Sequence, residues 1–268
     1  MPEFTSHQPG TFSWPELATT DQTAAVQFYR SLFGWDVDDV PMGPDDRYSV
    51  FKMRGLEVAA GYTMRPDERK MGIPPHWNAY VTVANADESA KRAQELGAKV
   101  LAPPFDVFDL GRMAVLQDPT GAVFQIWEAK KNIGAKILGE PGTLCWTELT
   151  TSDTAAAEKF YTALFGWTPK HSAPGSPMPY TEFSVKGATN PSVGMMAKQP
   201  HMPPEMPSFW LSYFLVTDVD ATAEKAKSLG AQIHFGPQDI PGTGRFAVIA
   251  DPQGAAFSVF TPKGVSRV

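Results

Sequence analysis

The chain has one cysteine, few histidines and no long apolar run. A single cysteine, Cys145, excludes an intrachain disulfide and is typical of a reducing compartment. No apolar stretch approaches the ~18 residues of a membrane-spanning helix. Residues 1–10 are polar and lack the basic start and apolar core of a secretory signal. We therefore expect a cytoplasmic protein without a membrane partner.

Basic clusters are also scarce. The net charge is −6, and Lys130-Lys131 is the one basic pair that stands out. This charge pattern argues against a nucleic-acid partner. Hydrophobic residues make up 43% of the 268 residues and charged residues 19%, as in a globular protein. The length suits two domains of about 130 residues each.

What the chain does contain is an internal repeat. Trp14-Pro15-Glu16-Leu17 returns as Trp146-Thr147-Glu148-Leu149, an offset of 132 residues. Further segments return at 132 or 133 residues, and chance does not produce such a series. These segments are Phe28-Tyr29 with Phe160-Tyr161, Leu32 to Trp35 with Leu164 to Trp167, Gly111-Arg112 with Gly244-Arg245, and Asp118 to Gly121 with Asp251 to Gly254. The chain is therefore a tandem duplication, with predicted domains at 10–128 and 142–262 and a linker at 129–141.

Each half reads as two units of one strand, one helix and three strands. Residues 11–17 alternate like a strand, Thr20 or Asp21 caps a helix, and Gly34 ends it. In the second unit, Asp87 is predicted to cap the helix, and an Asp-Pro-x-Gly turn joins a hairpin. Residues 66–75 read as a loop and residues 99–101 as a short extended segment. The fold class is α+β with four β-α-β-β-β units, paired either within or across the halves.

This arrangement resembles the vicinal oxygen chelate superfamily. The helix ending in Phe-Tyr…Leu-Phe-Gly-Trp and the Asp-Pro-x-Gly hairpin carry the likeness, which spans residues from about 10 to 262. That superfamily includes glyoxalase I, extradiol dioxygenases and bleomycin resistance proteins, and fused members are often labelled glyoxalase-like or hydroxylase. The resemblance implies mixed sheets that curl around open cavities.

Catalytic members of the superfamily hold a divalent metal on His and Glu side chains. The resemblance places the corresponding positions at Trp14, Asn78 and Gln125, and in the second half at Trp146, Leu211 and Ser258. Trp and Leu offer no metal donor, and amides or hydroxyls alone bind weakly. His76, His171 and His201 read as surface imidazoles, and His7 lies in the N-terminal tail. His234 is on a strand in the second half only, where a ligand role is the alternative. We expect no metal cofactor, and a divalent metal remains the alternative.

Strand alternation gives the residues expected to face each cavity. In the first half these are Phe12, Trp14, Glu16, Asn78, Tyr80, Gln125 and Trp127, and in the second half Trp146, Glu148, Tyr213, Ser258 and Phe260. Aromatic walls with a few polar groups are typical of small-molecule sites, and the rings suit a flat ligand.

Glu16 and Glu148 allow two interpretations, because a carboxylate within an aromatic strand is costly unless it is paired. Each could anchor a ligand or act as a general base with a raised pKa. Each could instead form a structural pair with the duplicated Arg112 or Arg245, which we also include as candidate ligand contacts.

These observations favour metal-independent binding of a small hydrophobic or aromatic molecule. The resemblance implies sequestration of a toxin or the handling of a secondary metabolite. The alternatives are a glyoxalase-type lyase or a dioxygenase or hydroxylase, with a metal or with Glu16 and Glu148 as acid–base groups, and a scaffold without a ligand. We expect a monomer or a homodimer.

Overall fold

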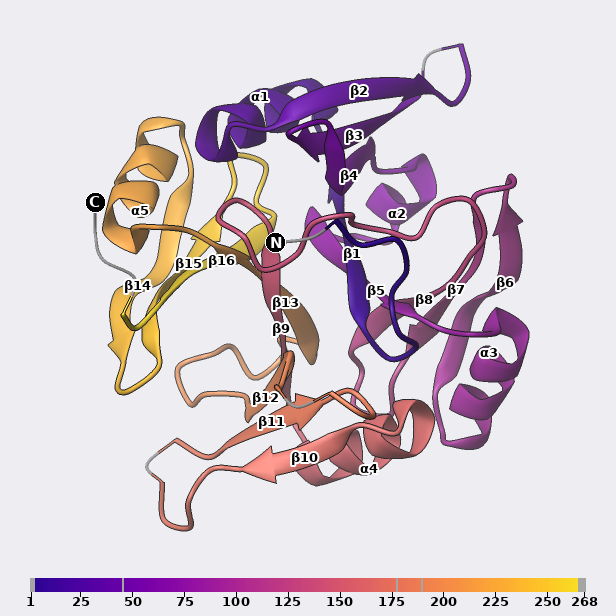
Figure 1. Cartoon of the computed structure of the whole chain (residues 1–268), viewed down its shortest axis with the longest axis vertical. Coiled ribbons are helices and arrows are strands. Elements are labelled where there is room, and N and C mark those ends of the chain that lie inside the picture. Colours follow the sequence, from indigo (N-terminus) through magenta and orange to yellow (C-terminus); the bar gives the residue numbers. More distant parts are fainter. Residues whose placement is uncertain (1–2, 45, 177, 189, 265–268) are drawn as a thin grey trace.

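The protein forms two eight-stranded mixed sheets, each built from one half of the chain (Figure 1). The structure, a computed structural model, describes residues 3–44, 46–176, 178–188 and 190–264. The first half contains β1 (Phe12–Thr19), α1 (Gln22–Phe33), β2 (Asp36–Pro41), β3 (Arg47–Met53), β4 (Leu56–Thr63), α2 (Pro66–Lys70), β5 (His76–Thr82), α3 (Ala86–Glu95), β6 (Lys99–Val107), β7 (Gly111–Gln117) and β8 (Val123–Ala129). The second half contains β9 (Leu144–Thr151), α4 (Thr154–Phe165), β10 (Thr168–His171), β11 (Tyr180–Ser184), β12 (Val193–Ala197), β13 (Phe209–Leu215), α5 (Val219–Ser228), β14 (Gln232–Ile240), β15 (Gly244–Ala250) and β16 (Ala256–Pro262). The predicted α+β class and its four β-α-β-β-β units are confirmed.

The strand order explains how two units share one sheet. It is β2-β3-β4-β1-β5-β8-β7-β6 in the first half and β10-β11-β12-β9-β13-β16-β15-β14 in the second. The first strands of the two units, β1 and β5, pair antiparallel at the centre, as β9 and β13 do. Each of these strands pairs in parallel with the last strand of its own unit. The units of a sheet therefore pair within a half of the chain.

The helices begin and end largely where their capping residues predict. Asp21 accepts a hydrogen bond from the Ala24 amide at 3.0 Å, and Gly34 ends α1 with a left-handed φ of 73°. The prediction that Asp87 caps α3 is wrong, because Asn85 accepts the bond from the Glu88 amide at 2.8 Å and Asp87 lies in the first turn. Within the described residues, no helix is long and apolar enough to cross a membrane.

Two segments are more ordered than their sequence indicates. The loop predicted at 66–75 contains α2, a short helix with Pro66 in its first turn, where a missing amide costs no helical bond. The short segment predicted at 99–101 is the beginning of β6, which continues to Val107 through Pro103 and Pro104. A sheet tolerates prolines there because β6 is an edge strand with irregular register.

The halves pack against each other through two apolar clusters outside the curled sheets. One cluster joins α3 and neighbouring strands of the first half to α4, Trp167 and Trp210 of the second. The other joins α1 to α5 and Phe257, and Figure 1 shows α1 beside α5 and α3 beside α4. The duplicated Phe-Tyr pairs therefore pack in the core between the halves.

Candidate functional site

In the first half, Glu16 lies buried at the middle of the central strand β1. Its side chain is 8% exposed and accepts three hydrogen bonds. The Tyr48 hydroxyl donates to Oε1 at 2.7 Å, and the Tyr80 hydroxyl donates to Oε2 at 2.8 Å. The Asn78 amide donates to Oε2 at 3.3 Å. Strands β3, β1 and β5 thus bring their polar side chains together around one carboxyl group.

The second half repeats this arrangement around Glu148, which is also 8% exposed. The Tyr180 hydroxyl donates to Oε2 at 2.6 Å and the Tyr213 hydroxyl donates to Oε1 at 2.9 Å. The Trp146 indole donates to the Tyr180 hydroxyl at 3.0 Å. The same contact joins Trp14 to Tyr48 in the first half at 3.1 Å. We call each set of one Trp, two Tyr and one Glu a Glu–Tyr cluster.

Burial raises the pKa of both glutamates, because an ionised carboxylate loses its hydration inside the protein. The tyrosine hydroxyls oppose this shift by donating to the charged form, and Asn78 and His76 add to their effect at Glu16. Burial and the adjacent carboxylates raise the pKa values of Tyr48, Tyr80, Tyr180 and Tyr213. The four hydroxyls therefore keep their protons and remain donors at neutral pH.

The two clusters differ beside the glutamate. In the first half, Asn78 Oδ1 contacts His76 Nε2 at 3.1 Å and accepts from Gln125 Nε2 at 2.7 Å. At the corresponding positions the second half has Leu211 and Ser258, and the Ser258 hydroxyl donates to the backbone of β15 at 2.9 Å. The first site is therefore a chain of polar groups, whereas the second is mostly apolar beyond its carboxyl group.

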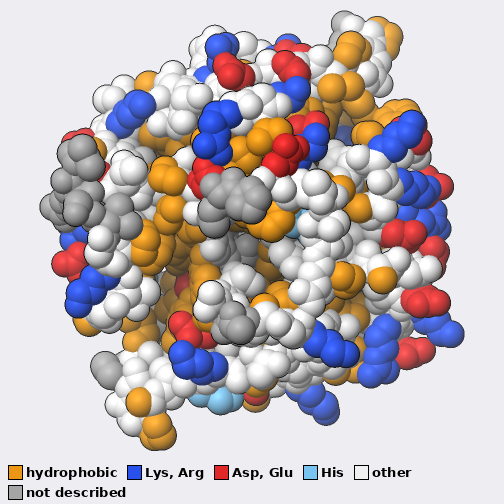
Figure 2. Space-filling view, in the orientation of Figure 1, with side chains coloured by type: hydrophobic (Ala, Val, Ile, Leu, Met, Phe, Trp, Pro, Cys, Tyr) orange, Lys and Arg blue, Asp and Glu red, His pale blue; other side chains and the backbone are white. Residues whose placement is uncertain are grey.

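Aromatic side chains pack around both Glu–Tyr clusters. Trp14, Tyr80 and Trp127 form an apolar cluster with Ala135, which belongs to the segment between the halves. That segment is held to β1 by the Ala135 amide, which donates to Ser13 O at 2.7 Å. In the second half, Phe246 lies 6.4 Å from the Tyr213 ring, and Phe260 is half-buried. In Figure 2 hydrophobic side chains gather in a hollow on the side where Figure 1 shows β14 to β16.

Phe12 does not belong to the first site, contrary to prediction. Between Phe12 and Trp14, β1 advances two residues while β5 advances only from Val81 to Tyr80, which is a β-bulge. The extra residue turns the Phe12 side chain to the opposite face. There its ring lies 4.8 Å from that of Trp210.

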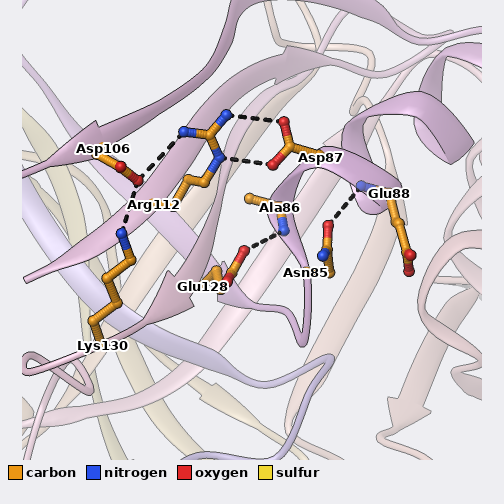
Figure 3. A network of polar contacts seen from close by, with 8 residues as sticks. All are labelled: Asn85, Ala86, Asp87, Glu88, Asp106, Arg112, Glu128 and Lys130. Atoms are coloured by element: carbon orange, nitrogen blue, oxygen red, sulfur yellow. Dashed lines mark hydrogen bonds and ion pairs between the residues drawn. The ribbon is translucent and has the colours of Figure 1, made fainter.

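The two arginines lie apart from the glutamates, so the suggested Arg–Glu pairing is wrong. Arg112 binds both carboxylate oxygens of Asp87, at 2.7 and 2.9 Å, and also contacts Asp106 (Figure 3). Arg245 repeats this fork with Asp220 and Asp239. Figure 3 shows that the Arg112 fork ties the first turn of α3 to the hairpin of β6 and β7.

Arg245 also lines a cavity of about 350 Å³ at the N-terminus of α5. This cavity is separate from the Glu148 cluster. Both Asp218 and Asp239 line it, and Asp239 pairs with the arginine. Its charge is therefore largely balanced within the protein.

The described geometry can be compared with known proteins. A sequence model of the Glyoxalase/Bleomycin resistance protein/Dioxygenase superfamily matches residues 11–126 and again residues 143–259. The chain belongs to this superfamily. The two matches coincide with the two sheets, so each half is a complete copy of the superfamily domain.

Curated relatives match nearly the whole chain. "Putative glyoxylase CFP32" of Mycobacterium tuberculosis (strain CDC 1551 / Oshkosh) is 43% identical over 267 residues, which is 98% of this chain and 98% of the relative. "Anthracycline biosynthesis protein DnrV" of Streptomyces peucetius is 33% identical over 279 residues, 95% of this chain and 94% of the relative. Both relatives therefore match this chain over its two halves, although their names differ.

Solved structures share the fold at low sequence identity. The Mn(II)-bound glyoxalase from Novosphingobium aromaticivorans has a TM-score of 0.64 and 16% identity, covering 95% of this chain and 82% of that one. The 2,3-dioxygenase LapB from Pseudomonas sp. KL28 has a TM-score of 0.63 and 14% identity, covering 94% and 93%. At this identity the likeness extends to the fold alone.

The residues at the superfamily's metal positions do not fit a metal ion. The first site offers an indole at Trp14 and amides at Asn78 and Gln125, and the second offers an indole, Leu211 and a hydroxyl. Hard and borderline cations prefer carboxylates, imidazoles or thiolates. Across the part of the chain that the structure describes, no three His, Cys, Asp or Glu side chains are grouped to share an ion. Of the side chains that metals prefer, the first site has Glu16 and His76, and the second has Glu148.

Sequence reasoning missed three members of the sites. Tyr48 and Tyr180 both bond the glutamates, and they are exact counterparts at the 132-residue offset, so the repeat could have revealed them. His76 was expected on the surface, yet it is half-buried in β5 beside Asn78. Asn78 is only two residues away on the same strand, so strand alternation could have placed the two side chains on one face. His234, in contrast, is exposed.

Proposed function

We propose that each half binds a small aromatic or hydrophobic molecule without a resident metal. The observation that carries this proposal is the Glu–Tyr cluster, which occurs twice with the same donors at 2.6–2.9 Å from the carboxyl group. Strand alternation places these polar groups among aromatic rings on the inner face of each sheet. Apolar walls with a few fixed polar groups are the usual composition of a small-molecule site.

The cluster has the chemistry to recognise a polar group on a flat ring. The tyrosine hydroxyls can turn from the glutamate to a ligand oxygen, and a protonated glutamate can donate to the same atom. The indoles of Trp14 and Trp146 offer faces for stacking. A relative named for anthracycline biosynthesis supports a fused-ring aromatic as the ligand class.

A second candidate function is acid–base catalysis by a glyoxalase-type lyase, or oxygenation of the bound molecule. The raised pKa of Glu16 and Glu148 favours the first chemistry, because a carboxyl group that titrates closer to neutrality is a better proton acceptor. In that case the glutamate would take a proton from the ligand, and the adjacent tyrosines would donate to the oxygen that becomes negative. The relative named as a glyoxylase supports this candidate.

Metal content and ligand binding separate these functions. We would first measure metals element by element in protein purified without chelator or nickel resin. We would then add the one-ring probes p-cresol and p-xylene and follow the indole N–H resonances of Trp14 and Trp146 by NMR. Each indole bonds a tyrosine of its own cluster, so each reports on one site.

We expect no stoichiometric metal and a saturable shift of both indole resonances. Glu16→Gln should weaken cresol binding at the first site only, and Glu148→Gln should weaken it at the second only, so each variant is the control for the other. One or two metal ions per chain that survive dialysis would overturn the metal-independent proposal. If neither probe shifted either indole, the binding proposal itself would fail.

A further inference from the structure

Gln125 carries an unused hydrogen-bond acceptor inside the first site. The residue is 4% exposed, and its Oε1 atom has no hydrogen-bond partner among the described residues. Phe124 and Ile126 on either side point into the apolar cluster between the halves, so Gln125 faces the inner surface of the sheet with Trp127. A buried acceptor without a donor is rare in folded proteins and calls for a partner.

The hydrogen-bond chain fixes which end of the amide is free. Gln125 Nε2 donates to Asn78 Oδ1 at 2.7 Å, and Asn78 Nδ2 donates to Glu16 Oε2 at 3.3 Å. If the Gln125 amide were turned over, its oxygen would face Asn78 Oδ1, and two acceptors would meet. If the Asn78 amide were turned over, its nitrogen would face Gln125 Nε2, and Glu16 would lose this donor. Glu16 therefore orients Asn78, Asn78 orients Gln125, and Oε1 of Gln125 remains to accept a bond from outside the protein.

At the position that corresponds to Gln125, the second site has no buried acceptor without a partner. Leu211 replaces Asn78, and the Ser258 hydroxyl that replaces Gln125 already donates to Ala247 O at 2.9 Å. Tyr80 and Tyr213, in contrast, are kept, and each donates to its glutamate. The two sites thus share the Glu–Tyr cluster, but only the first also has a buried amide oxygen, Gln125 Oε1, without a hydrogen-bond partner among the described residues.

We propose that Gln125 makes the first site selective for aromatic molecules that carry a hydrogen-bond donor, such as a ring hydroxyl, whereas the second site lacks this selectivity. This inference rests on the proposed binding function. A ligand donor would satisfy Oε1, whereas a methyl group in its place would leave the oxygen buried and unpaired. Sites built to bond a substrate hydroxyl reject analogues that lack it for this reason.

The matched probes p-cresol and p-xylene test the selectivity, because they differ only in a hydroxyl and a methyl group of similar size. We would titrate each probe into the full chain and follow the Trp14 and Trp146 indole resonances separately. We expect p-cresol to bind the first site roughly tenfold more tightly than p-xylene, from the usual penalty for an unpaired buried acceptor. The preference at the second site should be smaller.

Gln125→Met keeps the side-chain volume and removes the acceptor. It should abolish the cresol preference at the first site and leave the second site unchanged. Gln125→Ser, which installs the residue of the second half, should do the same, so one variant remains if the other folds poorly. Ser258→Ala is the matched control and should leave the first site's preference intact.

The outcomes distinguish the two proposals. Equal binding of both probes at the first site, or a preference that survives in both Gln125 variants, would overturn the role of Gln125 and leave the binding function standing. Binding at the second site alone would also overturn it. Failure of both probes at both sites would overturn the binding function and this inference together.

Discussion

The Tyr29 hydroxyl, in the first half, donates a hydrogen bond to Asp251 Oδ2, in the second half, at 3.0 Å. Tyr161 makes the reciprocal bond to Asp118 Oδ2 at 2.8 Å. Each hydroxyl also accepts a bond from a buried indole, at 3.0 Å from Trp77 and 3.1 Å from Trp210. The Asp of each Asp-Pro-x-Gly turn therefore has two functions. One carboxylate oxygen accepts the hydrogen bond from the other half, and the other oxygen accepts hydrogen bonds from backbone amides of the turn.

Replacing Tyr29 with Phe should destabilise the folded chain by about 1–3 kcal/mol, because it leaves a buried carboxylate and a buried indole each short of a partner. Tyr29 is fully buried, so water cannot replace the hydroxyl without opening the interface. The free energy of unfolding in urea would measure the change, and Tyr161→Phe should behave alike.

Tyr62→Phe is the matched control. Its hydroxyl donates to Glu68 at 2.9 Å within the first half, and the residue is half-buried. We expect this variant to lie within about 0.5 kcal/mol of the parent chain. Equal losses for Tyr62→Phe and Tyr29→Phe would contradict a special role for the bonds between the halves.

The stability contributed by the glutamates should fall as the pH rises. Burial raises the pKa of Glu16 and Glu148 from the reference value of 4.5, so the folded chain binds these protons more tightly than the unfolded chain. The folded state is therefore favoured below about pH 4.5, and this advantage is lost as the pH rises from there through the folded pKa. Urea unfolding from about pH 4 to pH 8 would compare the parent with Glu16→Gln/Glu148→Gln. Parallel curves of unfolding free energy against pH would show that folding does not raise the pKa of these carboxyl groups.

Gly194→Ala should disrupt the second site selectively. A methyl group at this position would lie 1.8 Å from the Tyr180 hydroxyl oxygen and 2.6 Å from the Trp146 indole nitrogen. Since the first half has Ala60 at the equivalent position beside β1, the requirement for glycine is specific to the second site. Tyr180 would have to leave Glu148. We expect a stability loss of about 1–3 kcal/mol and a shift of the Trp146 indole resonance. An unchanged Trp146 resonance would argue against the packing described, and Ala60→Gly is the control.

Arg112→Met should lower thermal stability slightly and leave ligand binding unchanged. Arg112 and Asp87 are on the surface, and their fork fastens α3 to the neighbouring hairpin (Figure 3). The pKa of Asp87 is lowered by its bond to Arg112, so the contribution of the fork should disappear in acid. Thermal unfolding and p-cresol titration would measure the two effects. A large loss of cresol binding would restore Arg112 as a ligand contact.

Much of the fold could be predicted because its signals are local or repeated. Asp21 and Gly34 bound α1 through backbone geometry that depends on residues next to them. The repeat made each strand and each long helix of one half a prediction for the other. Tyr48 and Tyr180 also recur at the repeat offset. A search for polar residues that occur in both halves would therefore have identified them as candidate site residues.

Other features depend on distant partners and could not be predicted from one strand or helix. The β-bulge before Trp14 is a mismatch between β1 and β5, so strict alternation placed Phe12 on the wrong face. The partner of Arg112 was uncertain because Asp87 and Glu16 are both far from it in the sequence.

The two halves have separate sites but share their interfaces, and this arrangement has a consequence for the origin of the chain. Each half completes its own sheet and its own glutamate site, yet supplies only one side of each interface. A single ancestral half would have exposed its Tyr–Trp face, and two identical copies could have covered that face symmetrically, each giving its tyrosine to the other's aspartate. Fusion of the two copies would then have freed them to diverge, so that one site could keep an amide where the other acquired a leucine.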